Sequence, residues 1–77
     1  MKDIIFEILN EIKPEQNFYD SDNYIDDGML DSFDIIELIS MLEEKFDIVI
    51  DGMDIIPEYF SNVKQIERLV RKSGYND

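Results

Sequence analysis

The sequence predicts an all-α fold, a small bundle of three to four helices with a long first loop. Three stretches carry apolar residues at the spacing of an amphipathic helix. A polar segment over residues 15–30, without sustained periodicity, separates the first two stretches. The chain has 77 residues, enough for one small domain, so we expect residues 1–77 to form a single bundle whose apolar stripes face one another.

The first helix is expected over about residues 3–13. Pro14 ends it, because proline lacks a backbone N–H and disfavours the helical conformation in the residue before it. The stripe that this helix would bury consists of Ile5, Ile8, Leu9 and Ile12.

The segment 15–30 is expected to be an ordered connection rather than a linker. Loops of this length are uncommon in so small a domain unless they pack or function. Its apolar residues can pack under the helices; they are Phe18, Tyr19, Tyr24, Ile25, Met29 and Leu30.

The second helix is expected to start at Asp31 or Ser32, after a break at Gly28, and to end near Phe46. One face carries the apolar stripe of Ile35, Leu38, Ile39, Leu42 and Phe46. The opposite flank carries Phe33 and Ile36, interleaved with Asp34, Glu37, Ser40 and Glu44. Large apolar groups in an acidic setting beside a serine at a helix start suggest a recognition surface centred on Ser32.

The segment 47–50 is β-branched, but it is short and lacks an evident partner, so we expect a loop that helps to close the core. Pro57 favours the first position of a single helical turn.

The last helix is expected over about residues 62–72, with Asn62 and Gln65 in a capping-box pattern and Gly74 past its end. Its buried stripe consists of Val63, Ile66, Leu69 and Val70.

The charge balance is strongly acidic. Nineteen acids against seven bases give a formal net charge of −12, and residues 20–47 contain ten acids against Lys45 alone. Such a field repels phosphate backbones and anionic lipid, so binding to nucleic acid and to membrane surfaces is disfavoured. Partners are expected to carry Arg and Lys.

The absent residue types narrow the chemistry further. The chain contains no cysteine and no histidine, so it cannot build a disulfide, a thiolate metal site, or a Ser-His or Cys-His catalytic site. No signal peptide and no apolar run long enough to span a bilayer is evident, so a cytoplasmic location is expected. We expect no bound metal, because the acids near Asp20 and Asp22 lack the spacing of an EF-hand loop.

The triplet Asp31-Ser32-Phe33, preceded by a glycine-containing loop and followed by an acidic amphipathic helix, resembles the attachment signature of the acyl carrier protein family. The resemblance covers nearly the whole chain and implies the same helical fold. It also implies a carrier that is not an enzyme. In that family a transferase attaches 4'-phosphopantetheine from coenzyme A to the serine, and the thiol of this arm holds acyl or aminoacyl groups as thioesters.

The resemblance implies a role for each residue near the triplet. Ser32 would be the attachment point, and Asp31 would help to position the transferase's metal-bound coenzyme A. Phe33 and Ile36 would be apolar docking contacts. The acids expected to meet partner cations are Asp34, Glu37, Glu43 and Glu44.

The partners implied are a phosphopantetheinyl transferase, an adenylating or acyl ligase, and acyl-processing enzymes with basic docking surfaces. We expect the carrier itself to be a monomer.

The subclass of carrier is less regular in this sequence. Gly28 is followed by two residues, Met29 and Leu30, before the triplet, whereas fatty-acid carriers usually have one residue there. The triplet ends in Phe33, whereas fatty-acid carriers usually have Leu at this position. These features are similar to stand-alone carriers of peptide or polyketide pathways and to D-alanyl carrier proteins, although the Trp that the latter often show is absent.

Two other readings stay open at this stage. Asp and Ser are both common at helix starts, so one alternative is an unmodified helical interaction module in which Ser32 belongs only to a cap. An enzyme with paired carboxylates is the weaker alternative, because no definite pair stands out and so short a chain offers little room for a substrate pocket.

Overall fold

The computed structural model describes residues 1–76, and the described chain is all-helical, as predicted. Three α-helices make up the bundle: α1 (Lys2–Ile12), α2 (Ser32–Phe46) and α3 (Val63–Lys72). Three short 3-10 turns lie in the connections: η1 (Phe18–Asp20), η2 (Gly52–Asp54) and η3 (Pro57–Phe60). None of the described helices has the length and apolar character needed to cross a membrane, and the cytoplasmic location stays a prediction.

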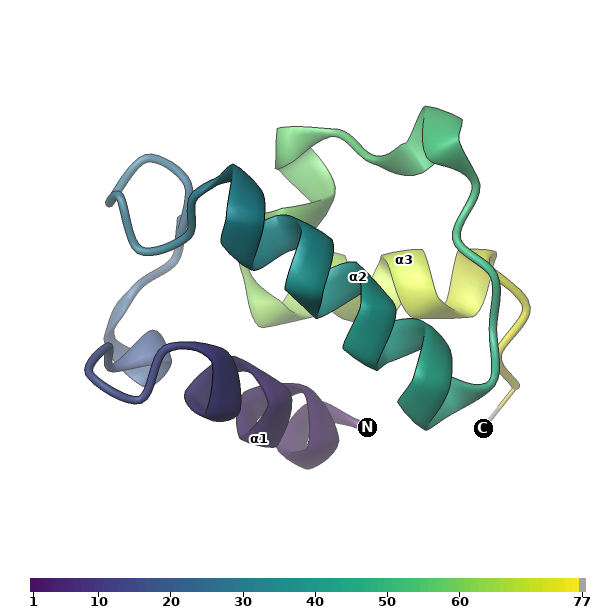
Figure 1. Cartoon of the computed structure of the whole chain (residues 1–77), viewed down its shortest axis with the longest axis horizontal. Helices are drawn as coiled ribbons and strands as arrows, with labels where there is room; N and C mark the ends of the chain where they lie inside the picture. Colours follow the sequence, from purple (N-terminus) through teal and green to yellow (C-terminus); the bar gives the residue numbers. More distant parts are fainter. Residues whose placement is uncertain (77) are drawn as a thin grey trace.

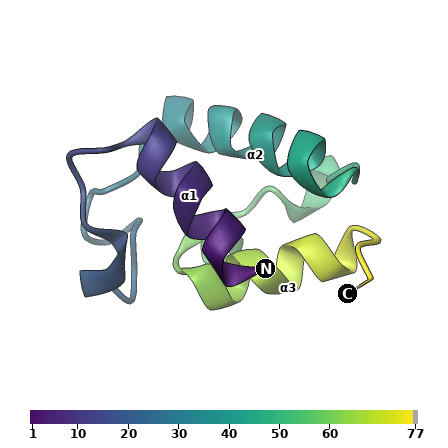
Figure 2. The same cartoon turned by 90° about the horizontal axis from the view of Figure 1, so that it is seen from below.

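The first helix holds the bundle together by contacting both of the others. α1 packs against α2 and against α3, and η3 packs against α3. Figure 1 shows α2 crossing in front of α3, with α1 beside it, and Figure 2 shows α2 and α3 on two sides of the molecule. The predicted stripes meet in the middle, where Ile5, Leu9, Leu42, Ile66 and Leu69 are fully buried. Burial of these stripes is what stabilises helices that would be marginal in isolation.

The long first connection is ordered, as expected, because its aromatic residues anchor it to the core. Tyr24 is buried, donates its hydroxyl hydrogen to the Phe18 carbonyl oxygen at 3.1 Å, and contacts the Phe18 ring edge-on. The side-chain amide of Asn62 holds the connection to the start of α3 by donating to the Asp22 carbonyl oxygen at 3.1 Å. Tyr19 departs from the expected packing: it is 75% exposed and stacks on Phe6 with 4.0 Å between ring centroids.

The segment after α2 is a loop, and no strand occurs anywhere in residues 1–76. Asp47 adopts a left-handed conformation with φ of 54°, which small polar side chains tolerate, and this reverses the chain at the end of α2. Ile48 and Ile50 then point into the core, while Val49 points outward. The loop thus closes one end of the core without any sheet.

The start of α3 differs in one detail from the predicted capping box. Asn62 Oδ1 accepts a hydrogen bond from the Gln65 backbone N–H at 2.9 Å, as expected of an N-cap. The reciprocal bond from Gln65 is not formed, because its side-chain oxygen accepts instead from Arg68 Nη1 at 3.4 Å. Lys72, at the other end of α3, pairs with Asp54 of η2 at 2.7 Å, and not with an acid of α2.

Candidate prosthetic-group attachment site

Ser32 occupies the first position of α2 and is exposed. Gly28 turns the chain before it with φ of +69°, a conformation that favours glycine. Met29 and Leu30 then point into the core and fix the approach to the helix. Within residues 1–76 the Ser32 hydroxyl forms no hydrogen bond, so it is free to react with an incoming group.

A reciprocal capping box encloses this serine. Asp31 is the N-cap, and its Oδ1 accepts a hydrogen bond from the Asp34 backbone N–H at 2.9 Å. Asp34 Oδ2 accepts in return from the Asp31 backbone N–H at 3.0 Å. Two backbone N–H groups that a helix start would leave unpaired are thereby satisfied, and the residues between them, Ser32 and Phe33, are held in the first turn.

A cation at the end of α1, the C-cap residue Lys13, completes this arrangement. Lys13 Nζ lies 3.3 Å from Asp34 Oδ2 and 3.9 Å from Glu15 Oε2. The hydrogen bond and charge of Asp34 raise the pKa of Lys13. The Asp34 backbone N–H, aided by Lys13, holds the pKa of Asp31 below its ordinary value. Sequence reasoning missed Lys13, although it is the only base between Asp3 and Glu44.

The exposed position expected for Asp34 is therefore wrong. The residue is only 8% exposed, and its carboxylate is engaged by Lys13 and by the Asp31 N–H. The helical spacing placed it on the outer flank, but the third position of a capping box turns the side chain back toward the N-cap.

The remaining predicted docking residues fall into two groups. Phe33 is 81% exposed and Ile36 is 65% exposed, and Glu37 and Glu44 are exposed beside them on α2. Glu43 instead lies half-buried, and its Oε2 accepts a hydrogen bond from the Ile50 backbone N–H at 2.9 Å. The structure thus groups four of these residues on one outer surface and turns Glu43 toward the loop after α2.

An apolar groove begins beside Ser32 and has a volume of about 310 Å³. Ile35, Ile36 and Ile39 of α2 line one side of it, and Ile55, Ile56 and Pro57 line the other. Phe60 also lines the groove, and no charged side chain does. Sequence reasoning did not find this groove, because its two sides lie far apart in the chain.

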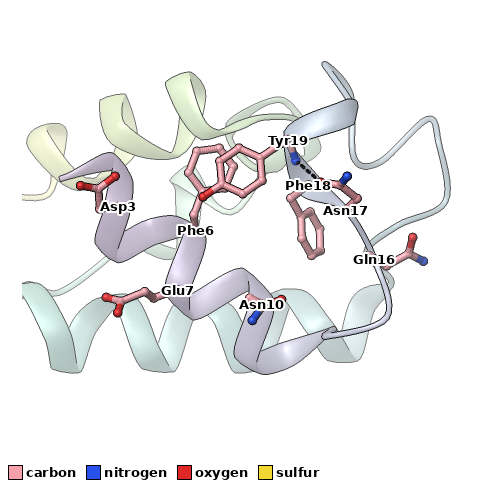
Figure 3. A pocket seen from close by; sticks show the side chains of 8 residues that line it. All are labelled: Asp3, Phe6, Glu7, Asn10, Gln16, Asn17, Phe18 and Tyr19. Atoms are coloured by element: carbon pink, nitrogen blue, oxygen red, sulfur yellow. Dashed lines mark hydrogen bonds between the residues drawn. The ribbon is translucent and has the colours of Figure 1, made fainter.

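A larger hollow, of about 540 Å³, lies between α1 and η1. Figure 3 shows the Phe6 and Tyr19 rings at one side of it, with Glu7 and Asn10 projecting from α1. None of the predicted site residues lines this hollow. The triplet Asp31-Ser32-Phe33 lies at the start of α2 and not at the larger hollow.

Comparison with known proteins shows which family this chain belongs to. Residues 1–70 match the protein family described as "Phosphopantetheine attachment site". The chain belongs to the acyl carrier protein family. An acyl carrier protein of Sulfurovum sp. (strain NBC37-1) is 37% identical over 71 residues, covering 90% of this chain and 92% of that relative. An acyl carrier protein of Bdellovibrio bacteriovorus is 36% identical over 78 residues, covering 96% and 90%.

Other relatives match over a shorter stretch. An acyl carrier protein of Buchnera aphidicola subsp. Acyrthosiphon pisum (strain Tuc7) is 54% identical over 50 residues, which is 65% of this chain. The match spans 60% of the length of that relative. The comparison with solved structures found no significant match.

Membership of the family has two consequences for the chain. Acyl carrier proteins are carriers and not enzymes, and their cofactor is a covalently attached 4'-phosphopantetheine. The start of α2 fits such a group, because it offers an exposed hydroxyl at the N-terminus of a 15-residue helix. The helix dipole favours the negative charge of a phosphodiester at that end.

Proposed function

We propose that Ser32 is the residue that receives 4'-phosphopantetheine, and that the protein carries acyl groups as thioesters on this arm. In the attachment reaction, Ser32 Oγ bonds to the β-phosphorus of coenzyme A while the bond to the adenosine bisphosphate leaving group breaks. The serine proton passes to a base of the transferase. The chain contains no cysteine, so the thiol must come from the arm.

The observation that carries this proposal is the exposed, unbonded Ser32 hydroxyl at the start of α2, set beside two exposed apolar side chains. Ser40 lies on the same helix and is also exposed. However, it is not next to the N-cap residue of α2, and it does not line the apolar groove. Of these two exposed serines of α2, Ser32 is the one that combines an available hydroxyl with a surface on which a transferase can dock.

Mass spectrometry after incubation with coenzyme A and a broad-specificity transferase tests the assignment. The wild type and Ser40→Ala should each gain one arm, and Ser32→Ala should gain none. Partner binding that survives Ser32→Ala, with no modification of the wild type, would instead favour an unmodified interaction module. A gain of mass by Ser32→Ala would refute the assignment of Ser32.

The groove supports acyl cargo over the aminoacyl or D-alanyl cargo that the sequence left open. It is lined by isoleucines, Pro57 and Phe60, and it opens next to Ser32. An alkyl chain lying there would leave water, which stabilises the loaded protein in proportion to the area buried. A D-alanyl group carries an ammonium that gains nothing from this lining.

Thermal unfolding of loaded proteins distinguishes these cargoes. We expect an octanoyl thioester on the arm to raise Tm relative to the free-thiol form, and an alanyl thioester to leave it unchanged. The variant Ile39→Ser, which makes the groove lining polar, should reduce the octanoyl effect. Equal Tm values for both cargoes would remove the argument for acyl groups while leaving Ser32 as the attachment point.

The docking surface proposed for partner enzymes consists of Phe33, Ile36, Glu37 and Glu44. These residues suit a transferase, an acyl ligase and acyl-processing enzymes that present apolar pockets bordered by Arg and Lys. Asp34 and Glu43 are left out, because their carboxylates are engaged within the fold. We further propose that the chain acts as one monomeric carrier domain.

A further inference from the structure

Lys13 connects the end of α1 to the start of α2. Its Nζ lies 3.3 Å from Asp34 Oδ2, although residues 13–31 separate the two helices in sequence. The Lys13 side chain is 27% exposed and the Asp34 side chain is 11% exposed, so the pair is partly withdrawn from water. This contact is a direct polar link between the residue that caps the end of α1 and the turn that bears Ser32.

The acceptor atom of this contact has a second partner. Asp34 Oδ2 also accepts the hydrogen bond from the Asp31 backbone N–H at 3.0 Å. Asp31 Oδ1 in turn accepts from the Asp34 backbone N–H at 2.9 Å. The ammonium, the two carboxylates and the two N–H groups form one connected network around the first turn of α2.

Charge explains why this turn needs a cation. Asp31 and Asp34 place two carboxylates on a single turn, in a part of the chain where acids strongly outnumber bases. Like charges at this distance repel and would loosen the turn. Lys13 offsets that repulsion, and no other base between Asp3 and Glu44 is available to replace it.

We propose that Lys13 is a positioning residue for the modification of Ser32. By neutralising Asp34, it keeps the capping box closed and holds the Ser32 hydroxyl in the orientation that the transferase meets. This inference rests on the proposed function of Ser32 and adds a residue that never touches the transferred group. Partly exposed ion pairs contribute little to overall stability, so the effect should be local.

The test compares Lys13→Met with two matched variants. Lys13→Arg keeps the charge at the same position. Lys45→Met removes the same charge from an exposed position in the last turn of α2, far from Ser32. For each variant we measure kcat/KM for arm transfer, amide hydrogen exchange at Asp31 and Asp34 by NMR, and Tm.

We expect Lys13→Met to lower kcat/KM roughly tenfold, since a reacting group that is no longer held in place reacts more slowly. The amides of Asp31 and Asp34 should exchange faster in this variant, while core amides and Tm change little. Lys13→Arg should retain most of the rate, and Lys45→Met should behave as the wild type does.

Transfer to Lys13→Met at the wild-type rate would overturn the positioning role and leave Ser32 as the attachment point. Equal slowing of Lys13→Met and Lys45→Met would also overturn it, because net charge alone would then explain the effect. Absence of transfer to the wild type would refute the proposed function itself, and the positioning role with it.

Discussion

The two faces of α2 carry similar apolar residues under opposite conditions. Leu38 and Leu42 on the inner face are completely buried, whereas Phe33 and Ile36 on the outer face lie mostly in water. Burial of the inner residues supplies the free energy that folds a small bundle. Folding gives no comparable reason for Phe33 and Ile36, so the outer face points to binding.

The strongest way to break this comparison is to truncate one residue on each face. Leu42→Ala should lower the free energy of unfolding by about 2–5 kcal/mol, because it removes buried methyl groups and leaves a cavity. Phe33→Ala should change it by less than about 0.5 kcal/mol, as is usual for exposed positions. Urea denaturation followed by circular dichroism measures both. Similar losses for the two variants would contradict the division of the faces.

Truncation of the outer face should instead affect binding to the transferase. Phe33→Ala should raise the Kd for the transferase about tenfold, since exposed aromatic residues often dominate an interface. Isothermal titration calorimetry or surface plasmon resonance measures this value. As a matched control in the loop after α2, Val49→Ala removes another exposed apolar side chain and should leave Kd unchanged. An unchanged Kd for Phe33→Ala would place docking elsewhere.

Two neighbouring glutamates sharpen the comparison further. Glu43→Ala should cost about 1 kcal/mol of stability, because the N–H of the buried residue Ile50 loses its acceptor. Glu44→Ala should cost almost nothing but should weaken transferase binding at low ionic strength, with the difference fading as salt is added. If Glu44→Ala were the more destabilising variant, the assignment of Glu43 to the fold and Glu44 to the outer face would be reversed.

The smallest expected effect is a pH dependence at the start of α2. The Asp34 backbone N–H holds the pKa of Asp31 below its ordinary value of 3.8. A carboxylate with a lowered folded-state pKa stabilises the fold above pH 3.8, and this contribution is lost as pH falls through the folded-state value.

The stability difference between wild type and Asp31→Asn should therefore shift in favour of the wild type above pH 3.8. Asparagine is the appropriate replacement, because it also caps helices but does not titrate. Chemical denaturation across this pH range measures the difference. A difference that stays constant with pH would show that the Asp31 carboxylate makes no such contribution.

Periodicity and local motifs were enough to predict the three helices, most of their buried positions and the exposed Phe33 and Ile36 beside Ser32. Ile12, Ile35 and Ile39 of the predicted stripes are only half-buried, and the last two line the groove. These features depend on residues three or four positions apart, which the helix itself brings onto one face. The resemblance of Asp31-Ser32-Phe33 to the attachment signature likewise required no knowledge of the fold, and the family is confirmed by the match over residues 1–70. The identity of Ser32 as the attachment point stays a prediction.

Contacts between different elements of the fold could not be predicted from such local patterns. The approach of Lys13 to Asp34, the turning of Glu43 toward Ile50, and the pairing of Ile36 with Ile55 and Ile56 across a groove all depend on how the helices and loops pack. Helical spacing placed Asp34 on the outer flank, and the family resemblance added Glu43 to the docking acids. Neither source of information identifies the partner that a side chain meets within the fold. Tertiary packing therefore decided which acids support the fold and which remain free to meet another protein.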